Sequence, residues 1–284
     1  MLLEGAIGDA YGAGFEFAEI EKIKAKNNIT AYEIHPLFEE IKGKYTDDTQ
    51  MSLAVAELLI EGKEWTALSI ANKFVEVFKR DPRRGYAKRF YQFLYEIKDG
   101  QELLDNIHPK SERNGAAMRA YPIGILKNEK EILSKTELQA SVTHQTEKAI
   151  LAAQTIALTS HFFIYDKGKI SELLIYLSDI LDYEWKANWQ GEVRVEAIET
   201  VEAVLTILTK ESNLKSMLKK SVDFGGDVDT VASLALAIGK MNKNVENNLP
   251  SFLYDELENG NFGRDYIKKI DKELYQLKDA RKNI

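Results

Sequence analysis

The chain has 284 residues, with 38 Lys and Arg against 45 Asp and Glu, so its formal net charge is −7. This length allows one large or two small domains and buries a substantial core. The absence of cysteine excludes disulfides, thiolate nucleophiles and Cys-ligated metal sites, and it suits a reducing cytoplasm. Mild acidity disfavours nucleic-acid partners, which need clustered Lys and Arg, but it suits divalent cations.

The sequence also indicates that the protein has no membrane-spanning segment. No apolar run approaches the roughly 18 residues that a spanning helix needs. The first residues, MLLEG, lack the basic and apolar regions of a signal peptide. We therefore expect a cytoplasmic protein with no membrane partner.

Apolar residues recur at helical spacing along most of the chain, which predicts an all-α protein. In chain order, the predicted helices cover 51–60, 65–78, 86–97, 147–158, 170–183, 192–208, 231–238 and 264–281. The segment 32–37 is predicted to be either a short strand or a loop. Residues 1–284 are expected to form one domain, with 241–284 as a C-terminal helical extension of it.

Two short acidic segments each precede an apolar helix: YTDDTQ at 45–50 and GGDVDT at 225–230. Helix capping alone explains a single Asp or Thr at such a place. However, the adjacent carboxylates of Asp47 and Asp48 repel each other unless a cation lies between them. The glycine pair before Asp227 and Asp229 allows a sharp turn and a close approach of the backbone. Because hard cations take carboxylate and hydroxyl oxygens, the two segments together predict a metal site.

Three further segments are candidates for binding or packing. In GAIGDAYGAGFEF at 5–17, the glycines predict close helix packing, and Glu16 is a candidate functional acid. In NGAAMR at 114–119, backbone N–H groups at a helix start could bind an anion such as phosphate. In SVTHQ at 141–145, His144 stands at a predicted helix start, where a neutral imidazole could form a hydrogen bond with a ligand hydroxyl. The other three histidines are interpreted as structural.

Taken together, these five segments resemble the ADP-ribosylglycohydrolase family, and they stand in the order in which that family has them. The resemblance spans residues 2 to about 240. It implies a compact orthogonal bundle of helices with a central two-metal site.

The resemblance also implies roles for individual residues. Glu16 matches a glutamate near the metals that swings between two positions, and Asp9 is interpreted as structural. Asn114 and Gly115 match the loop beside the ADP-ribose phosphates, and His144 matches a histidine that contacts the substrate. The implied metal ligands are Thr46, Asp47, Asp48, Asp227, Asp229 and Thr230. Many members of the family have Gly where this chain has Arg113, which either contacts phosphate or closes the pocket.

The implied activity is hydrolysis of the bond at ribose C1 of an ADP-ribosylated protein or small molecule. Two divalent cations, Mg²⁺ or Mn²⁺, would orient the ribose and the attacking water. Asp227 or Glu16 would take the proton of that water. Tyr121 and Phe224 are candidates for the wall against which adenine packs.

Three alternatives remain open at this point. The substrate could be another ADP-ribose-linked compound, such as a free metabolite or a nucleic-acid adduct. The same two-ion chemistry would serve a metal-dependent phosphohydrolase. A catalytically inert, ligand-binding relative is a third possibility, although such a protein has no need of mutually repelling Asp pairs. The sequence does not name the acceptor linkage, the metal or the oligomeric state.

Overall fold

Helices make up the regular structure throughout residues 1–280, which are the part of the chain that this computed structural model describes, with side chains through residue 278. The α-helices are α1 Leu2–Ala13, α2 Ile20–Lys26, α3 Asp47–Glu61, α4 Ala67–Arg80, α5 Lys88–Glu96, α6 Gly100–Asn106, α7 Glu129–Ser141, α8 Glu147–Ile164, α9 Leu173–Leu181, α10 Ala197–Lys210, α11 Leu214–Asp223, α12 Val228–Gly239, α13 Ser251–Asp255 and α14 Arg264–Ala280. Four short 3₁₀ helices lie between them, at Glu39–Ile41, Asn114–Ala116, Tyr121–Ile125 and Ile170–Glu172. The described residues contain isolated β-bridges but no longer strand.

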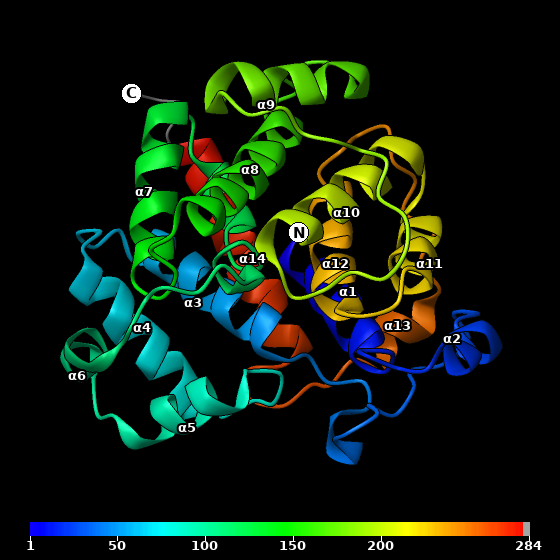
Figure 1. The fold of residues 1–284 in the computed structure, drawn as a ribbon, viewed down its shortest axis with the longest axis horizontal. Helices are drawn as coiled ribbons and strands as arrows, with labels where there is room; N and C mark the ends of the chain where they lie inside the picture. Colours follow the sequence, from blue (N-terminus) through cyan, green and yellow to red (C-terminus); the bar gives the residue numbers. More distant parts are fainter. Residues whose placement is uncertain (281–284) are drawn as a thin grey trace.

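Helices α1 and α12 pack against each other at the centre of the molecule (Figure 1). Both are almost wholly buried, which is why they carry apolar and small residues on every face. A Cβ atom on Gly8 would lie 2.3 Å from the carbonyl oxygen of Ala232, and one on Gly12 would lie 2.4 Å from Asp229 Cα. The glycines of α1 therefore set how closely the two helices approach, as the sequence predicted.

The remaining helices surround this central pair. Helices α3 and α14 pack against α1, whereas α8, α10 and α11 pack against α12. Helices α4, α5 and α6 form an outer group beside α3, and α9 lies across the end of α8 (Figure 1). No helix among residues 1–280 is both long and apolar enough to cross a membrane.

The predicted all-α class is confirmed, but several boundaries differ. Helix α10 begins at Ala197 and not at 192, because Val193 pairs with Gly226 and Glu196 pairs with Arg113 in β-bridges. Segment 32–37 is a loop. The prediction for 170–183 becomes a short 3₁₀ turn followed by α9, which ends at Leu181. Residue 281, the predicted end of the last helix, lies outside the described residues.

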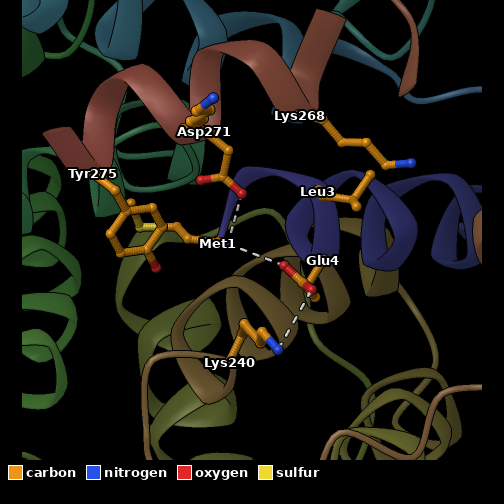
Figure 2. A pocket seen from close by; sticks show the side chains of 8 residues that line it. Met1, Leu3, Glu4, Lys240, Lys268, Asp271 and Tyr275 are labelled. Carbon is orange, nitrogen blue, oxygen red and sulfur yellow. Dashed lines mark hydrogen bonds and ion pairs between the residues drawn. The ribbon is translucent and has the colours of Figure 1, made fainter. Parts of the chain in front are cut away.

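The start of α1 is fastened to α14 by a cluster of charges (Figure 2). The amino group of Met1 donates to Glu4 Oε2 at 3.0 Å and to Asp271 Oδ2 at 2.9 Å. Lys240 Nζ, at the end of α12, lies 4.0 Å from Glu4 Oε1. A cavity of about 370 Å³ lies against this cluster. With a rise of about 1.5 Å per residue, α1 separates the cluster by nearly 20 Å from Glu16, which follows the other end of the helix.

Candidate metal centre

The start of α3 is held by Asp9, which comes from α1. The backbone N–H and the hydroxyl of Thr46 and of Thr49 all donate to the Asp9 carboxylate, at 2.6–3.0 Å. The first N–H groups of a helix have no partner within the helix, and Asp9 supplies that partner from a different helix. The DD pair of the first acidic segment is thereby fixed at the first turn of α3. This arrangement fits the interpretation of Asp9 as structural.

The second acidic segment begins with the sharp turn that its glycines predicted. Gly225 and Gly226 have φ of +76° and +83°, a region that residues with a side chain rarely adopt. A Cβ on Gly226 would lie 2.1 Å from the carbonyl oxygen of Val193. The turn places Asp227 at the N-cap of α12 and Asp229 in its first turn. The Gly226 carbonyl accepts the N–H of Phe17 at 2.8 Å, which brings the loop that carries Glu16 to the same place.

Carboxylates from two separate parts of the chain therefore meet, and the charge of Asp48, from a third part, acts on Asp229. One carboxylate oxygen from each of Glu16, Asp227 and Asp229 lies within 4.8 Å of the others. Asp48 Oδ1 is buried and has no hydrogen-bond partner among residues 1–278. The pKa values of Asp48 and Asp229 are raised well above the usual range, by burial first and then by the neighbouring carboxylates.

The pKa values of two other carboxylates of the cluster, Asp47 and Asp227, are also raised. Burial, followed by the charges of Asp9 and Glu16, raises the pKa of Asp47 well above its usual range. Burial raises the pKa of Asp227 to about 6, even though hydrogen bonds from Asp229 and Asn114 lower it. So many acids cannot all ionise side by side without a counter-charge, and a bound cation would supply that charge.

The donor set suits a hard divalent cation. Every candidate ligand offers oxygen, and the set includes the unpartnered Asp48 Oδ1. The side chain of Thr230 offsets part of the rise in the pKa of Asp48. The Thr46 hydroxyl donates its proton to Asp9 Oδ1 at 2.8 Å. All six residues proposed as ligands thus lie at the starts of α3 and α12, where the positive ends of two helix dipoles also favour negative charge.

Asn114 reaches the cluster by its side chain. Its Nδ2 donates to Asp227 Oδ2 at 2.5 Å and to Thr200 Oγ1 at 3.0 Å. Its backbone N–H donates to the carbonyl oxygen of Val195 at 3.0 Å. Asn114 thus holds Asp227, and the contact of this loop with phosphate stays a prediction. The neighbouring Arg113 is exposed, with its backbone paired to Glu196.

His144 lies in the turn between α7 and α8, with its ring against Gly115. A Cβ on Gly115 would lie 3.0 Å from His144 Nε2. The buried Arg119 donates from Nη2 to Thr143 Oγ1 at 2.7 Å. Since the Thr143 oxygen accepts this bond, its hydroxyl proton is free to be donated to His144 Nδ1, which also lies at 2.7 Å. The N–H of the imidazole is then at Nε2. Burial, followed by the charge of Arg119, lowers the pKa of His144 to about 3, which keeps the ring a neutral donor at pH 7.

Three residues at the site differ from their sequence interpretation or were absent from it. His35, interpreted as structural, contacts Glu16. Gly85, which the sequence did not single out, has φ of +106°, and a Cβ there would lie 1.9 Å from Asp47 Oδ1. Tyr121 is wholly buried against Gly5 of α1, so its suggested role as an adenine wall is wrong. Phe224, the other candidate for that wall, is half-buried.

The sequence profile of the ADP-ribosylglycohydrolase family matches residues 1–283. The chain belongs to this family. The ADP-ribosyl-[dinitrogen reductase] glycohydrolase of Rhodospirillum rubrum is 25% identical over 293 residues, which cover 97% of this chain and 92% of that protein. The ADP-ribosylarginine hydrolase Tri1 of Serratia proteamaculans is 22% identical over 80% of this chain and 66% of its own length. This chain thus spans about two thirds of the length of that relative.

A solved structure supports the same fold. An ADP-ribosylglycohydrolase-related protein complex superposes with a TM-score of 0.74 at 20% identity, covering 98% of this chain and 96% of the other. The predicted helical fold of the ADP-ribosylglycohydrolase type is therefore confirmed. Asp48, Asp227 and Asp229 are buried at the starts of α3 and α12, and Asp9 is buried within α1.

Proposed function

We propose that this protein is a metal-dependent hydrolase that cleaves the bond at ribose C1 of ADP-ribosylated substrates and releases ADP-ribose. The observation that carries the proposal is the convergence of Glu16, Asp48, Asp227 and Asp229 in a chain of this family. Asp48, Asp227 and Asp229 are buried, and Glu16 is partly buried. A bound cation would offset the repulsion among their charges, and the hydrogen bonds from Arg119 to Thr143 and from Thr143 to His144 leave a neutral donor for a ligand.

We propose that Thr46, Asp47, Asp48, Asp227, Asp229 and Thr230 hold two divalent cations, Mg²⁺ or Mn²⁺. When bound, such cations supply Lewis-acid chemistry, which lowers the pKa of water and orients hydroxyl groups. Asn114 holds the Asp227 carboxylate through its 2.5 Å hydrogen bond. His144 Nε2–H, on the Gly115 side of the loop, donates to an oxygen of the ADP-ribosyl group.

The bond cleavage passes through an oxocarbenium-like state at ribose C1, as in other glycosyl transfers. The bond from C1 to the acceptor breaks with its electron pair on the acceptor, and the oxygen of a water molecule forms the new bond to C1. A carboxylate oxygen of Asp227 or Glu16 takes the proton of that water. Both carboxylates stand in the cluster, and the variants Asp227→Asn and Glu16→Gln compare them.

We propose an arginine-linked protein as the first substrate to test. Its support is that one relative is named for ADP-ribosylarginine and another for ADP-ribosylated dinitrogen reductase. We further propose that residues 1–284 work as one domain, because α14 packs against α1 and α3. The cytoplasmic location remains a prediction.

The test is product analysis by mass spectrometry. The metal-free protein is incubated with Mg²⁺ or Mn²⁺ and with arginine-linked, serine-linked, O-acetyl and nucleic-acid-linked ADP-ribose, with and without chelator. We expect metal-dependent release of intact ADP-ribose from at least one of these substrates. Release of AMP or inorganic phosphate would instead identify a phosphohydrolase, and metal binding without any product would identify an inert relative.

A further inference from the structure

The Glu16 carboxylate has a specific partner outside the acidic cluster. His35 Nε2 lies 2.8 Å from Glu16 Oε2, and the His35 side chain is only 2% exposed. The other ring nitrogen, Nδ1, accepts the backbone N–H of Leu37 at 2.9 Å and that of Phe38 at 3.1 Å. Because two N–H donors point at Nδ1, that nitrogen carries no proton. The hydrogen is therefore on Nε2, and a neutral imidazole donates it to Glu16.

The two segments that carry Glu16 and His35 are tied to each other. Lys22 Nζ donates to the carbonyl oxygen of Gly14 and to that of Ile34, both at 2.7 Å. A Cβ on Gly14 would lie 2.8 Å from the carbonyl oxygen of Glu33, so the backbones approach closely. The position of His35 relative to Glu16 is thus set by the backbone on both sides.

Glu16 needs such a partner because its other neighbours repel it. It follows the end of α1 in a turn, with Phe17 next to it at φ of +48°, and its side chain is only partly buried. One of its carboxylate oxygens lies within 4.8 Å of those of Asp227 and Asp229. Without a hydrogen-bond donor on the side away from these two acids, their negative charges would push the Glu16 carboxylate toward solvent.

We propose that His35 is a positioning residue, which orients the Glu16 carboxylate toward Asp227 and Asp229 by donating from Nε2. Because a Glu16 oxygen lies close enough to those of Asp227 and Asp229 to hold a cation together with them, His35 would stand one step behind that cation. Partners in such a position commonly change metal affinity or activity by about 10- to 100-fold when they are lost. The consequence for catalysis rests on the proposed function, whereas the consequence for metal affinity and for the tautomer of the ring does not.

Two substitutions separate the two hydrogen-bonding ends of the ring. In His35→Asn, the amide oxygen replaces Nδ1 and still accepts from Leu37 and Phe38, but nothing reaches Glu16. In His35→Gln, the amide nitrogen replaces Nε2 and still donates to Glu16, but the two backbone N–H groups lose their acceptor. His108→Asn, at an exposed histidine, is the matched control.

Three readouts are compared: Mn²⁺ affinity by calorimetry on the metal-free protein, the thermal midpoint, and kcat and KM for ADP-ribose release. We expect His35→Asn to keep its thermal midpoint and to lose about 10- to 100-fold in Mn²⁺ affinity or in kcat. We expect His35→Gln to unfold at a lower temperature than wild type, and to stay within about threefold of wild type in Mn²⁺ affinity and in kcat. In ¹⁵N-histidine spectra of the wild type, the resonance missing from His35→Asn should show a neutral ring protonated at Nε2.

A purely structural role predicts the opposite order for Mn²⁺ affinity and kcat. His35→Gln would then be impaired in both, and His35→Asn would equal wild type in both. That result would overturn the proposal. A His35 resonance protonated at Nδ1 would overturn it as well. If wild type binds Mn²⁺ but releases no ADP-ribose, the proposed function fails. The calorimetry and the spectra would then still decide for or against the role of His35.

Discussion

At the scale of single residues, Asp227 is the carboxylate with the most distinct set of contacts. It stands at the N-cap of α12, accepts from Asn114 at 2.5 Å, and lies in the same cluster as Glu16 and Asp229. Its pKa of about 6 is the outcome of opposing effects, since burial raises it and the hydrogen bonds from Asp229 and Asn114 lower it. In the metal-free protein this carboxyl is half-ionised near pH 6, so protons and a cation compete for it in that range.

Asn114→Ala removes one of the hydrogen bonds that lower the pKa of Asp227. The pKa of this carboxyl in the metal-free protein should therefore rise, and protons should compete with Mn²⁺ up to a higher pH. We expect the Mn²⁺ affinity at pH 6 to fall by about 10- to 100-fold, as for other lost partners of metal ligands. Calorimetric titrations with Mn²⁺ between pH 5 and 8 measure the shift. An unshifted pH dependence of the affinity would show that Asn114 does not act through Asp227, and Asn106→Ala, at an exposed asparagine, serves as the control.

The residues of the site differ in how far the sequence could predict them. The acids at 45–50 and 225–230 stand beside buried helices and glycines, so local pattern and chemistry are enough to identify them. His35 and Gly85 lie in irregular segments without any pattern. Each acquires its role only when the fold brings it against Glu16 or Asp47, from 19 residues away in the first case. Likewise, the sequence alone does not link Arg119 to His144, because that link is made by the contact of Arg119 with Thr143 in the fold.

At the scale of elements, the contact between α1 and α12 positions the second half of the site. Gly12→Ala would place a Cβ 2.4 Å from Asp229 Cα, and backbone atoms cannot move aside as the end of a flexible side chain can. We expect the free energy of unfolding to fall by about 1–3 kcal/mol, as for other overpacked interiors, together with weaker Mn²⁺ binding. Urea unfolding and calorimetry measure the two effects. Gly260→Ala, which meets nothing within 4 Å, should change stability by less than about 0.5 kcal/mol.

The start of α3 depends in the same way on a residue of α1. Asp9→Ala would leave the N–H and hydroxyl groups of Thr46 and Thr49 buried without an acceptor. Because each unpartnered buried donor costs about 1–3 kcal/mol, the variant should lose at least about 3 kcal/mol of stability in urea unfolding. Asp105→Ala, which removes an exposed carboxylate, is the control. A loss below about 1 kcal/mol would contradict the role of Asp9 as the cap of α3.

Periodicity predicted the existence of most long helices and failed where a distant segment competes for the backbone. The apolar pattern over 192–208 favours a helix, yet the Val193 N–H donates to Gly225 and its carbonyl oxygen accepts from Asp227. These contacts join residues more than 30 positions apart, so no local pattern reveals them. Helices α7 and α11 carry few uninterrupted apolar residues and were not predicted.

At the scale of the whole molecule, the acidic cluster couples stability to pH and to metal. In the unfolded chain an Asp loses its proton near its ordinary pKa of 3.8, whereas the folded metal-free protein raises the pKa of Asp9 and Asp227 to about 6. The pKa values of Asp47, Asp48 and Asp229 are raised further. The native state thus holds more protons, and the stability that these groups contribute below about pH 4 is lost as the pH rises through their folded pKa values.

A divalent cation should offset this loss, because it binds the ionised cluster of the native state. We therefore expect Mn²⁺ to raise the thermal midpoint more at pH 8 than at pH 5.5, as measured by calorimetric or fluorescence melting. The double variant Asp47→Ala, Asp229→Ala should show no rise at either pH. An equal rise at both pH values in the wild type would mean that the cation binds elsewhere.

The measurement that tests the central claim most directly is the rate of ADP-ribose release by the wild type and by the Asp47→Ala, Asp229→Ala double variant. The substrate is an arginine-linked ADP-ribosylated protein, and Mn²⁺ is added stepwise to the metal-free enzymes. We predict no release without metal, a rate that saturates with Mn²⁺ in the wild type, and no release by the double variant at any Mn²⁺ concentration. Full activity of the double variant, or of the wild type in chelator, would contradict a two-metal hydrolase built on these acids.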